Sequence, residues 1–466
     1  MAKSSSNIKK MGGIDTRFAR ESSRFSDGKN FYTRGGSLFT RPGTSIVESP
    51  LTSDIISMVS APLPGQKTIL IVQQGNKLFH LKNKVWAEKY TLTSDKPLKY
   101  CRFINKILMV NGTDKLAYDI VFDNYSSIAG SGDDAMPNIE HLVTWRFRPF
   151  GWSPNTSESH MLRFSGYDED DMIDPSVWPP SFSLNVGGAS GSPIFAAFAS
   201  GNHLLVLTES TYTPVFGNTE NDFEIGASGM TSVLRPDTAG AIDDNVLWLG
   251  KDITGHLVVY LYSGTEPVII SEPIQDLIPF IELDTVFTKT FLNQFWVICN
   301  GKTDSRVLIY DVSEREWFVY EFPFTISSGT VFGEYLDDDY IYIGSSSTVI
   351  KLDPLVNTDI DNNVITTSFI WGPIGMNNRM LKPKTLYVVA EPSNDFNLAV
   401  TPIIDDNEEP EAVVLIFESL SNIKQVTESI RVPRDKGYNM SYKFSTTDNI
   451  NKINGLTVVY KAKGEK

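Results

Sequence analysis

The stretch Ile194-Phe-Ala-Ala-Phe-Ala-Ser-Gly-Asn-His-Leu-Leu-Val-Leu207 places two apolar runs on either side of a short polar turn at Asn202-His203. Helical periodicity is almost absent from the chain, and the runs are rich in the β-branched and aromatic side chains that fit a pleated surface. Asn and Asp suit the turns because they tolerate left-handed backbone and hydrogen-bond their own main chain. The stretch therefore predicts a β-hairpin, and similar patterns predict hairpins over residues 101–110, 241–249, 291–298 and 335–343.

The spacing of the hairpins indicates a structural repeat. The turn markers are Asn105, Pro149, Asn202, Asp244, Asn293 and Asp338, which lie 44, 53, 42, 49 and 45 residues apart. An earlier hairpin is predicted around Gly75-Asn76. Hairpins that recur about every 40 to 50 residues are typical of four-stranded propeller blades, which bury their faces only against neighbouring blades. We therefore expect an all-β protein with a β-propeller of about seven blades; the alternative is a large sandwich with irregular strands.

Three regions are predicted along the chain. Residues 1–50 have few apolar side chains and are predicted to form a basic extended N-terminal arm, and residues 51–364 are predicted to form the propeller. From about residue 365 the strands become longer and alternate more regularly, as in 366–371 and 380–389. Residues 365–466 are therefore predicted to form a C-terminal antiparallel β-sandwich-like module.

Charge is distributed unevenly in the 466-residue chain. The formal net charge is −15, which argues against nucleic-acid binding by the chain as a whole. Residues 1–41, however, contain nine Lys and Arg against three acids, so the remainder carries −21. A cationic arm on an acidic body suits docking onto an acidic partner or a neighbouring subunit, or contact with nucleic acid; the alternative is a disordered N-terminus. The residues predicted to bind a partner are Lys9, Lys10, Arg17, Arg20, Arg24, Arg34 and Arg41.

Residue patterns for catalysis are weak. Acidic residues cluster at 168–174, 337–339 and 405–409. Consecutive acids in a turn share one solvated environment. A general acid/base pair needs two carboxyl groups in different environments, so that their pKa values differ. Residues 359–363 place side chains with oxygen ligands at alternate positions, as in a calcium-binding loop. The sequence that follows lacks the glycine and the acidic residue that an EF-hand loop requires. Cys101 and Cys299 lie inside apolar runs, where cysteine is usually a small core residue. We therefore expect no enzyme activity, no cofactor and no metal.

Targeting and membrane signals are also missing from the sequence. No segment approaches the roughly 18 consecutive apolar residues of a transmembrane helix, and the first ten residues lack the apolar stretch of a secretory signal. We expect synthesis in a cytoplasm and no membrane span.

Several stretches resemble the tail hub or nozzle proteins of short-tailed bacteriophages (podoviruses), a family also described as packaged-DNA stabilisation proteins. The resemblance begins at 28–31 and 36–43, where a polar arm leads through Arg41-Pro42-Gly43 into the first blade. It continues in Trp145-Arg-Phe-Arg-Pro-Phe-Gly-Trp152. Further similar stretches are 161–166, 202–212, 215–217, 244–250 and 255–260.

The resemblance implies a structural virion protein of the short tail. In that family, subunits form a ring, usually of six copies, that extends the portal channel, retains packaged DNA and conducts it during ejection. The implied partners are further copies of the chain, the portal or adaptor ring, other tail rings and tail fibres. Double-stranded DNA would pass transiently through an acidic lumen that repels its phosphates. The implied location is the virion tail, after synthesis in the cytoplasm of a bacterial host.

Two other functions compete with the tail function. The first is a phage-associated β-propeller enzyme or binder that acts on host surface polysaccharide. The second is a propeller interaction module of a cellular protein, which would carry exposed aromatic side chains on one face of the ring.

Overall fold

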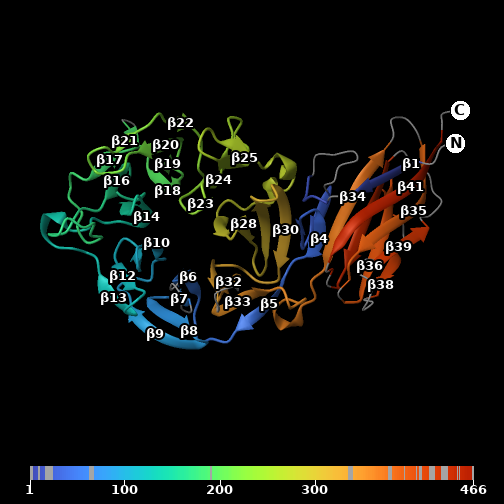
Figure 1. Ribbon diagram of the computed structural model, residues 1–466, viewed down its shortest axis with the longest axis horizontal. Helices are drawn as coiled ribbons and strands as arrows, with labels where there is room; N and C mark the ends of the chain where they lie inside the picture. The colour runs from blue at the N-terminus through green and yellow to red at the C-terminus, as the bar shows by residue number, and fades with distance from the viewer. Residues whose placement is uncertain are drawn as a thin grey trace.

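Small antiparallel sheets make up almost all of the computed structural model of the chain (Figure 1). The structure describes residues 4–8, 11–15, 25–61, 68–188, 191–333, 339–375, 380–392, 394–405, 407–408, 412–418, 426–431, 439–448, 450 and 452–463. The short 3-10 turns within them are η1 (Gly132–Asp134), η3 (Glu272–Ile274), η4 (Ile278–Phe280) and η5 (Ile360–Asn362).

Seven of the sheets are arranged as the blades of a propeller, which appears as a ring in Figure 1. In six of the blades the strands follow one another antiparallel in chain order, and in every blade the innermost strand faces the central axis. The first four blades are β6 (Ile55–Ala61), β7 (Ile69–Gln74), β8 (Lys77–Lys82) and β9 (Val85–Thr91); β10 (Lys99–Phe103), β11 (Lys106–Val110), β12 (Lys115–Asp119) and β13 (Asn124–Ser127); β14 (His141–Trp145), β15 (Arg148–Trp152), β16 (Met161–Phe164) and β17 (Ser183–Asn185); and β18 (Ile194–Ser200), β19 (His203–Thr208), β20 (Thr211–Phe216) and β21 (Glu224–Ile225), with β22 (Gly229–Met230) also on β20.

The last blade is closed by a strand from the N-terminal part of the chain. Blade seven takes its outermost strand from β5, which pairs antiparallel with β33 from Asp353↔Gly43 to Val349↔Val47. The ring is thus fastened by main-chain hydrogen bonds between segments about 300 residues apart, and β5 covers the outer edge of β33. The remaining blades are β23 (Ala239–Ile242), β24 (Asn245–Lys251), β25 (Leu257–Tyr262) and β26 (Val268–Ile269); β27 (Phe287–Phe291), β28 (Gln294–Asn300), β29 (Ser305–Asp311) and β30 (Glu316–Phe322); and β31 (Ser328–Gly333), β32 (Asp339–Ser345), β33 (Thr348–Asp353) and β5 (Gly43–Val47). The prediction of an all-β propeller of seven blades is confirmed.

One predicted turn marker is displaced in the structure, whereas the hairpin predicted around Gly75-Asn76 is present. Pro149 lies inside β15, and the turn is formed instead by Arg146 and Phe147, which adopt φ values of 52° and 59°. The Gly75-Asn76 turn joins the second and third strands of its blade, whereas the other described turns join the first and second. Asp338 lies outside the described residues. The period was nevertheless recognisable because every blade repeats the same hairpin.

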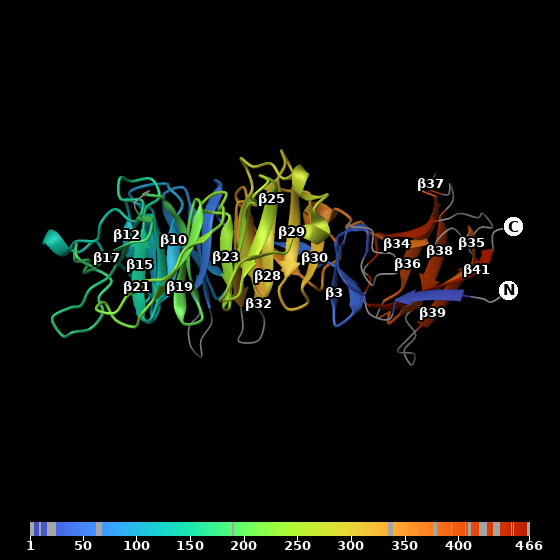
Figure 2. The same ribbon diagram turned by 90° about the horizontal axis from the view of Figure 1, so that it is seen from above.

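Two six-stranded sheets form the module beside the propeller (Figure 2). Alternate side chains of their strands are buried, as along β36, which gives the inward-facing apolar layer of a sandwich. Phe369 stacks on Phe444 with ring centroids 4.8 Å apart, and Phe396 stacks on Phe417 at 4.6 Å. The two sheets consist of β1 (Ser4–Ile8), β3 (Phe31–Arg34), β4 (Ser37–Thr40), β35 (Met380–Ala390), β39 (Val426–Arg431) and β41 (Ile453–Lys463); and of β2 (Asp27–Lys29), β34 (Thr367–Gly375), β36 (Phe396–Ile404), β37 (Asn407–Glu408), β38 (Val413–Phe417) and β40 (Asn439–Thr446).

The prediction that residues 1–50 form an extended arm is corrected by these pairings. β1 pairs with β41, β2 pairs with β34, and β4 meets β41 at Leu38↔Ile453. The next strand, β5, belongs to the propeller. The physical reason is that short strands with few apolar residues can add to the edges of a core supplied by distant segments, and a composition count over 50 residues does not detect such pairing.

Candidate functional site: the junction between the two modules

Two segments connect the sandwich to the propeller, and they lie side by side. One is Arg41-Pro42 between β4 and β5, and the other is residues 354–366 between β33 and β34. The Gly43 N–H donates to the Val356 carbonyl at 2.9 Å, and the Thr44 N–H donates to the Thr358 carbonyl at 2.9 Å. A Cβ on Gly43 would lie 2.4 Å from the Val356 oxygen, so only glycine permits this approach of the two backbones.

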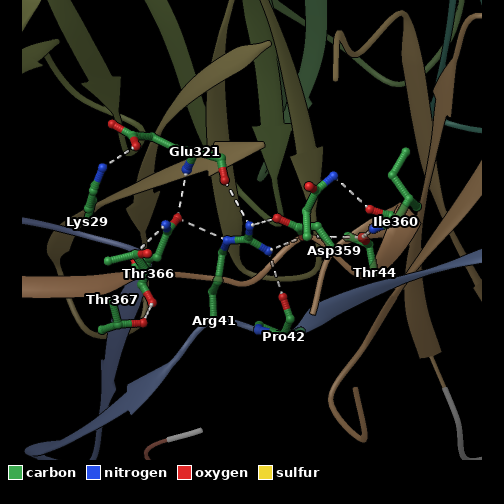
Figure 3. Close-up of polar contacts among 11 residues, drawn as sticks. Lys29, Arg41, Pro42, Thr44, Glu321, Asp359, Ile360, Thr366 and Thr367 are labelled. Carbon is green, nitrogen blue, oxygen red and sulfur yellow. Dashed lines mark hydrogen bonds and ion pairs between the residues drawn. The ribbon is translucent and has the colours of Figure 1, made fainter. Parts of the chain in front are cut away.

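Arg41 and Asp359 form a buried ion pair across the two segments (Figure 3). The Arg41 Nη1 donates to Asp359 Oδ1 at 3.0 Å, and Nη2 donates to Oδ2 at 2.5 Å. The two side chains are only 1% and 5% exposed. Such a two-bond arrangement matches the planar guanidinium to the planar carboxylate, and lysine cannot reproduce it.

The other N–H groups of Arg41 also have acceptors. Its Nε donates to Asn30 Oδ1 at 3.0 Å, while Nη1 and Nη2 donate to the carbonyls of Pro42 and Glu321 at 3.0 and 2.8 Å. The guanidinium carbon lies 4.5 Å from the centre of the Phe322 ring. All five donors are therefore used, as a buried arginine requires.

Asn30 joins three parts of the junction. It adopts a φ of 59°, in the left-handed region that Asn tolerates better than most residues. Its N–H donates to the Val319 carbonyl at 2.7 Å, and its Oδ1 accepts the Glu321 N–H at 2.8 Å, so it binds the outer strand of blade six. Its Nδ2 donates to the Thr366 carbonyl at 2.9 Å. Asn30 thus holds blade six, Arg41 and the second connecting segment together.

Thr44 completes the network on the propeller side. Its hydroxyl donates to Asp359 Oδ1 at 3.2 Å and accepts the Ile360 N–H at 2.9 Å. Asp359 is therefore held by Arg41 and Thr44 at once. The carboxylate is fully paired, which is the condition under which a buried charge is tolerated.

An apolar core surrounds the polar network and continues from one module into the other. Phe31 of the sandwich contacts Phe318 of blade six with ring centroids 6.2 Å apart, and it also contacts Phe25 at 5.3 Å and Phe369 at 5.8 Å. The Ile14 N–H donates to the Trp317 carbonyl of the same blade at 2.8 Å. Since the two modules share one core, they form a single rigid unit.

The residues predicted to bind a partner lie in different environments. Lys9, Lys10, Arg17, Arg20 and Arg24 lie outside the described residues. Arg34 is exposed at the β3–β4 turn, where it lines a cleft of about 370 Å³ together with Asp311 and Glu314 of blade six. The prediction that Arg41 binds a partner is wrong. Its side chain is buried in an ion pair within the chain, so it presents no charge to a partner. Composition could not reveal this, because Asp359 lies 318 residues away.

Two of the carboxylates considered for calcium or catalysis, Asp359 and Asp168, have structural roles. Asp359, the first residue of the candidate calcium stretch, is occupied by Arg41. Asp168 accepts the backbone N–H groups of Asp170 and Met172 at 2.9 Å and so stabilises its own turn. Among the described residues, no three His, Cys, Asp or Glu side chains gather closely enough to hold a metal ion.

The two cysteines are unreactive in this environment. Burial raises the pKa of the Cys101 thiol to about 12, and it raises the pKa of the Cys299 thiol to about 12 as well. Both thiols therefore remain protonated at neutral pH, where a nucleophile would have to be a thiolate. Within the described part of the chain, no helix has the length and apolarity needed to cross a membrane.

These features define an all-β protein in which a seven-bladed propeller and a β-sandwich are joined by a buried polar junction. No protein-family model matches the sequence, and no curated protein sequence matches it. Among solved structures, the chain is similar to Ycf48 from Cyanidioschyzon merolae, with 8% identity over 67% of this chain and 100% of that chain and a TM-score of 0.42. It is also similar to PorZ, a bacterial surface component of the type-IX secretion system of Porphyromonas gingivalis, with 12% identity over 73% of this chain and a TM-score of 0.41.

The chain spans 44% of the length of PorZ. A third similar structure is the Pan2 WD40 domain from Neurospora crassa, with 9% identity over 69% of this chain and 97% of that chain and a TM-score of 0.36. These similarities are too distant to bear on function, so the assignment of the propeller rests on the sheet topology described above.

Proposed function

We propose that this chain is a structural subunit of a bacteriophage short tail. Copies of it form a hub or nozzle ring that extends the portal channel, retains packaged DNA and conducts it during ejection. The resemblance of stretches such as 36–43 and 145–152 to the tail hub and nozzle family motivates the proposal.

The observation that carries the proposal is the rigid coupling of propeller and sandwich at the Arg41–Asp359 junction. A ring subunit has to present its interfaces at fixed angles, because small angular errors accumulate around a closed ring. A continuous core and a fully paired buried network hold the two modules in one orientation. The net charge of −15 suits a channel through which phosphates must slide without binding.

Quantitative mass spectrometry of purified phage particles that encode this chain tests the proposal. We expect the chain to be a constituent of mature particles at about half the copy number of the portal protein. Its absence from mature particles would contradict the tail function. Release of sugars from host surface polysaccharide by the purified chain would instead support the enzyme alternative.

A further inference from the structure

The innermost strands of the seven blades surround a central channel with a cavity of about 580 Å³. This volume lies within the range of roughly 300 to 1,000 Å³ that is typical of small-molecule sites. Residues from all seven blades line it, and they include the aromatic side chains of Tyr100 on β10 and Trp152 on β15. The channel belongs to the propeller alone and is remote from the junction with the sandwich (Figure 1).

Among the described residues, three charged side chains line the channel: Lys99 on β10, Lys289 on β27 and Asp237 just before β23. Asp237 is paired with Arg235, whose Nε lies 3.3 Å from its Oδ1. Neither lysine forms a hydrogen bond or an ion pair with any residue in the described part of the chain. The channel therefore carries an excess of positive charge inside a protein whose net charge is −15.

The two lysines are close enough to affect each other. Burial, with a smaller contribution from the charge of Lys99, lowers the pKa of Lys289 to about 8. Burial also lowers the pKa of Lys99, which Asp237 partly opposes. Ammonium groups that are half-buried and have no hydrogen-bond partner in the protein cost free energy. Other positions in the lining hold uncharged side chains such as Ser57, Ala197 and Thr330, so a lysine is not a general feature of these inner strands.

Asp237 opposes the lowering of the pKa at both lysines, but the other neighbouring titratable groups supply no negative charge. The His141 imidazole stacks on Trp152, with ring centroids 5.3 Å apart, and burial lowers its pKa to about 3, so the ring is neutral. The Tyr100 hydroxyl donates to the Met58 carbonyl at 2.8 Å, and burial raises its pKa to about 12. Neither group supplies a counter-charge to Lys99 or Lys289.

We propose that the central channel of the propeller is a binding site for a small, multiply charged oxyanion, a phosphate or carboxylate compound held between Lys99 and Lys289. Each ammonium would form a charge-assisted hydrogen bond with the ligand, and desolvation strengthens such bonds. A cavity of about 580 Å³ suits a small molecule better than a polymer. The site is independent of the tail function, because the DNA channel of the proposed ring would lie between subunits rather than within one propeller.

Isothermal titration calorimetry on the full chain tests this inference with tripolyphosphate and with citrate as probes. We expect one saturable site per chain for at least one of the two, and the comparison shows whether phosphate or carboxylate is preferred. Lys99→Met and Lys289→Met should each weaken binding at least tenfold, the order of magnitude expected for loss of a charged contact. The control is Lys302→Met, because Lys302 is exposed in a loop outside the channel.

Thermal unfolding checks that the variants are folded. Both channel variants remove an unpaired, desolvated charge, so we expect a melting temperature equal to or above that of the wild type. We also expect binding to weaken between pH 7 and pH 9.5 as Lys289 loses its proton, while His141 stays neutral and Tyr100 stays protonated. Absence of saturable binding by both probes would overturn the proposal. Binding that is unchanged in both channel variants would overturn it equally, because it would place the anion elsewhere.

Discussion

The guanidinium of Arg41 and the carboxylate of Asp359 are separated by 318 residues and meet through two hydrogen bonds of 3.0 and 2.5 Å. The pair lies where the chain passes from sandwich to propeller and where it returns. Both crossings are therefore fixed by one buried contact. This relationship makes the two modules a single mechanical unit and leads to the first prediction.

Arg41→Met should destabilise the protein by about 3 to 5 kcal/mol, because it leaves Asp359 buried and unpaired. Chemical denaturation monitored by fluorescence measures the change in the free energy of unfolding. The matched control is Lys29→Met at the same junction, since the Lys29–Glu321 pair is 38% and 40% exposed. Its loss should cost less than about 1 kcal/mol. Equal effects of the two substitutions would contradict the structural role of Arg41.

Gly43→Ala should destabilise the protein by about 2 to 4 kcal/mol. The new Cβ would lie 2.4 Å from the Val356 oxygen and 2.6 Å from the Thr358 oxygen, so the start of β5 would be forced away from the second connecting segment. Ile46→Ala in the same strand is the control, because Ile46 is 52% exposed. Thermal unfolding measures the stability of both variants. A Gly43→Ala protein as stable as the control would refute this account of the junction.

Stability should fall as the pH is lowered from 7 to 4. His80 is 1% exposed, and burial lowers its pKa to about 4 from the ordinary value of 6.5. Between these values the unfolded chain binds a proton that the folded chain does not. The stabilisation is therefore complete above pH 6.5 and is lost as the pH falls towards 4, by about 3 kcal/mol.

Denaturant unfolding at several pH values tests this dependence. His80→Phe should reduce the slope of stability against pH between 6.5 and 4, whatever its effect on absolute stability, while the buried His141, with a pKa of about 3, maintains the remaining slope. His256→Phe is the control, because the side chain of His256 is 72% exposed. The same slope in the wild type and in His80→Phe would rule out His80 as its source.

Reversing the charges of Arg17, Arg20 and Arg24 should abolish attachment of the chain to the preceding tail ring, if the basic residues near the N-terminus clamp an acidic face of that ring. Electron microscopy of particles assembled with the variant measures attachment. Lys302→Glu, which changes charge on the propeller instead, should assemble normally. Normal assembly of the triple variant would exclude this role for the three arginines.

Local patterns in the sequence were sufficient to predict the class of fold. Hairpins such as 194–207 are encoded by residues that touch within about a dozen positions, and their recurrence predicted the seven blades. Long alternating strands after residue 365 predicted the sandwich for the same reason. These features are local, so a single sequence displays them.

Only the tertiary structure decided how the N-terminal residues are used and where the charges lie. Residues 27–47 divide between both modules, Arg41 is buried against Asp359, and Lys99 and Lys289 line the same channel although 190 positions separate them. Each of these outcomes depends on contacts between segments far apart in the chain. Composition and spacing report the sign of a charge, whereas its pairing and its exposure to water are properties of the folded chain.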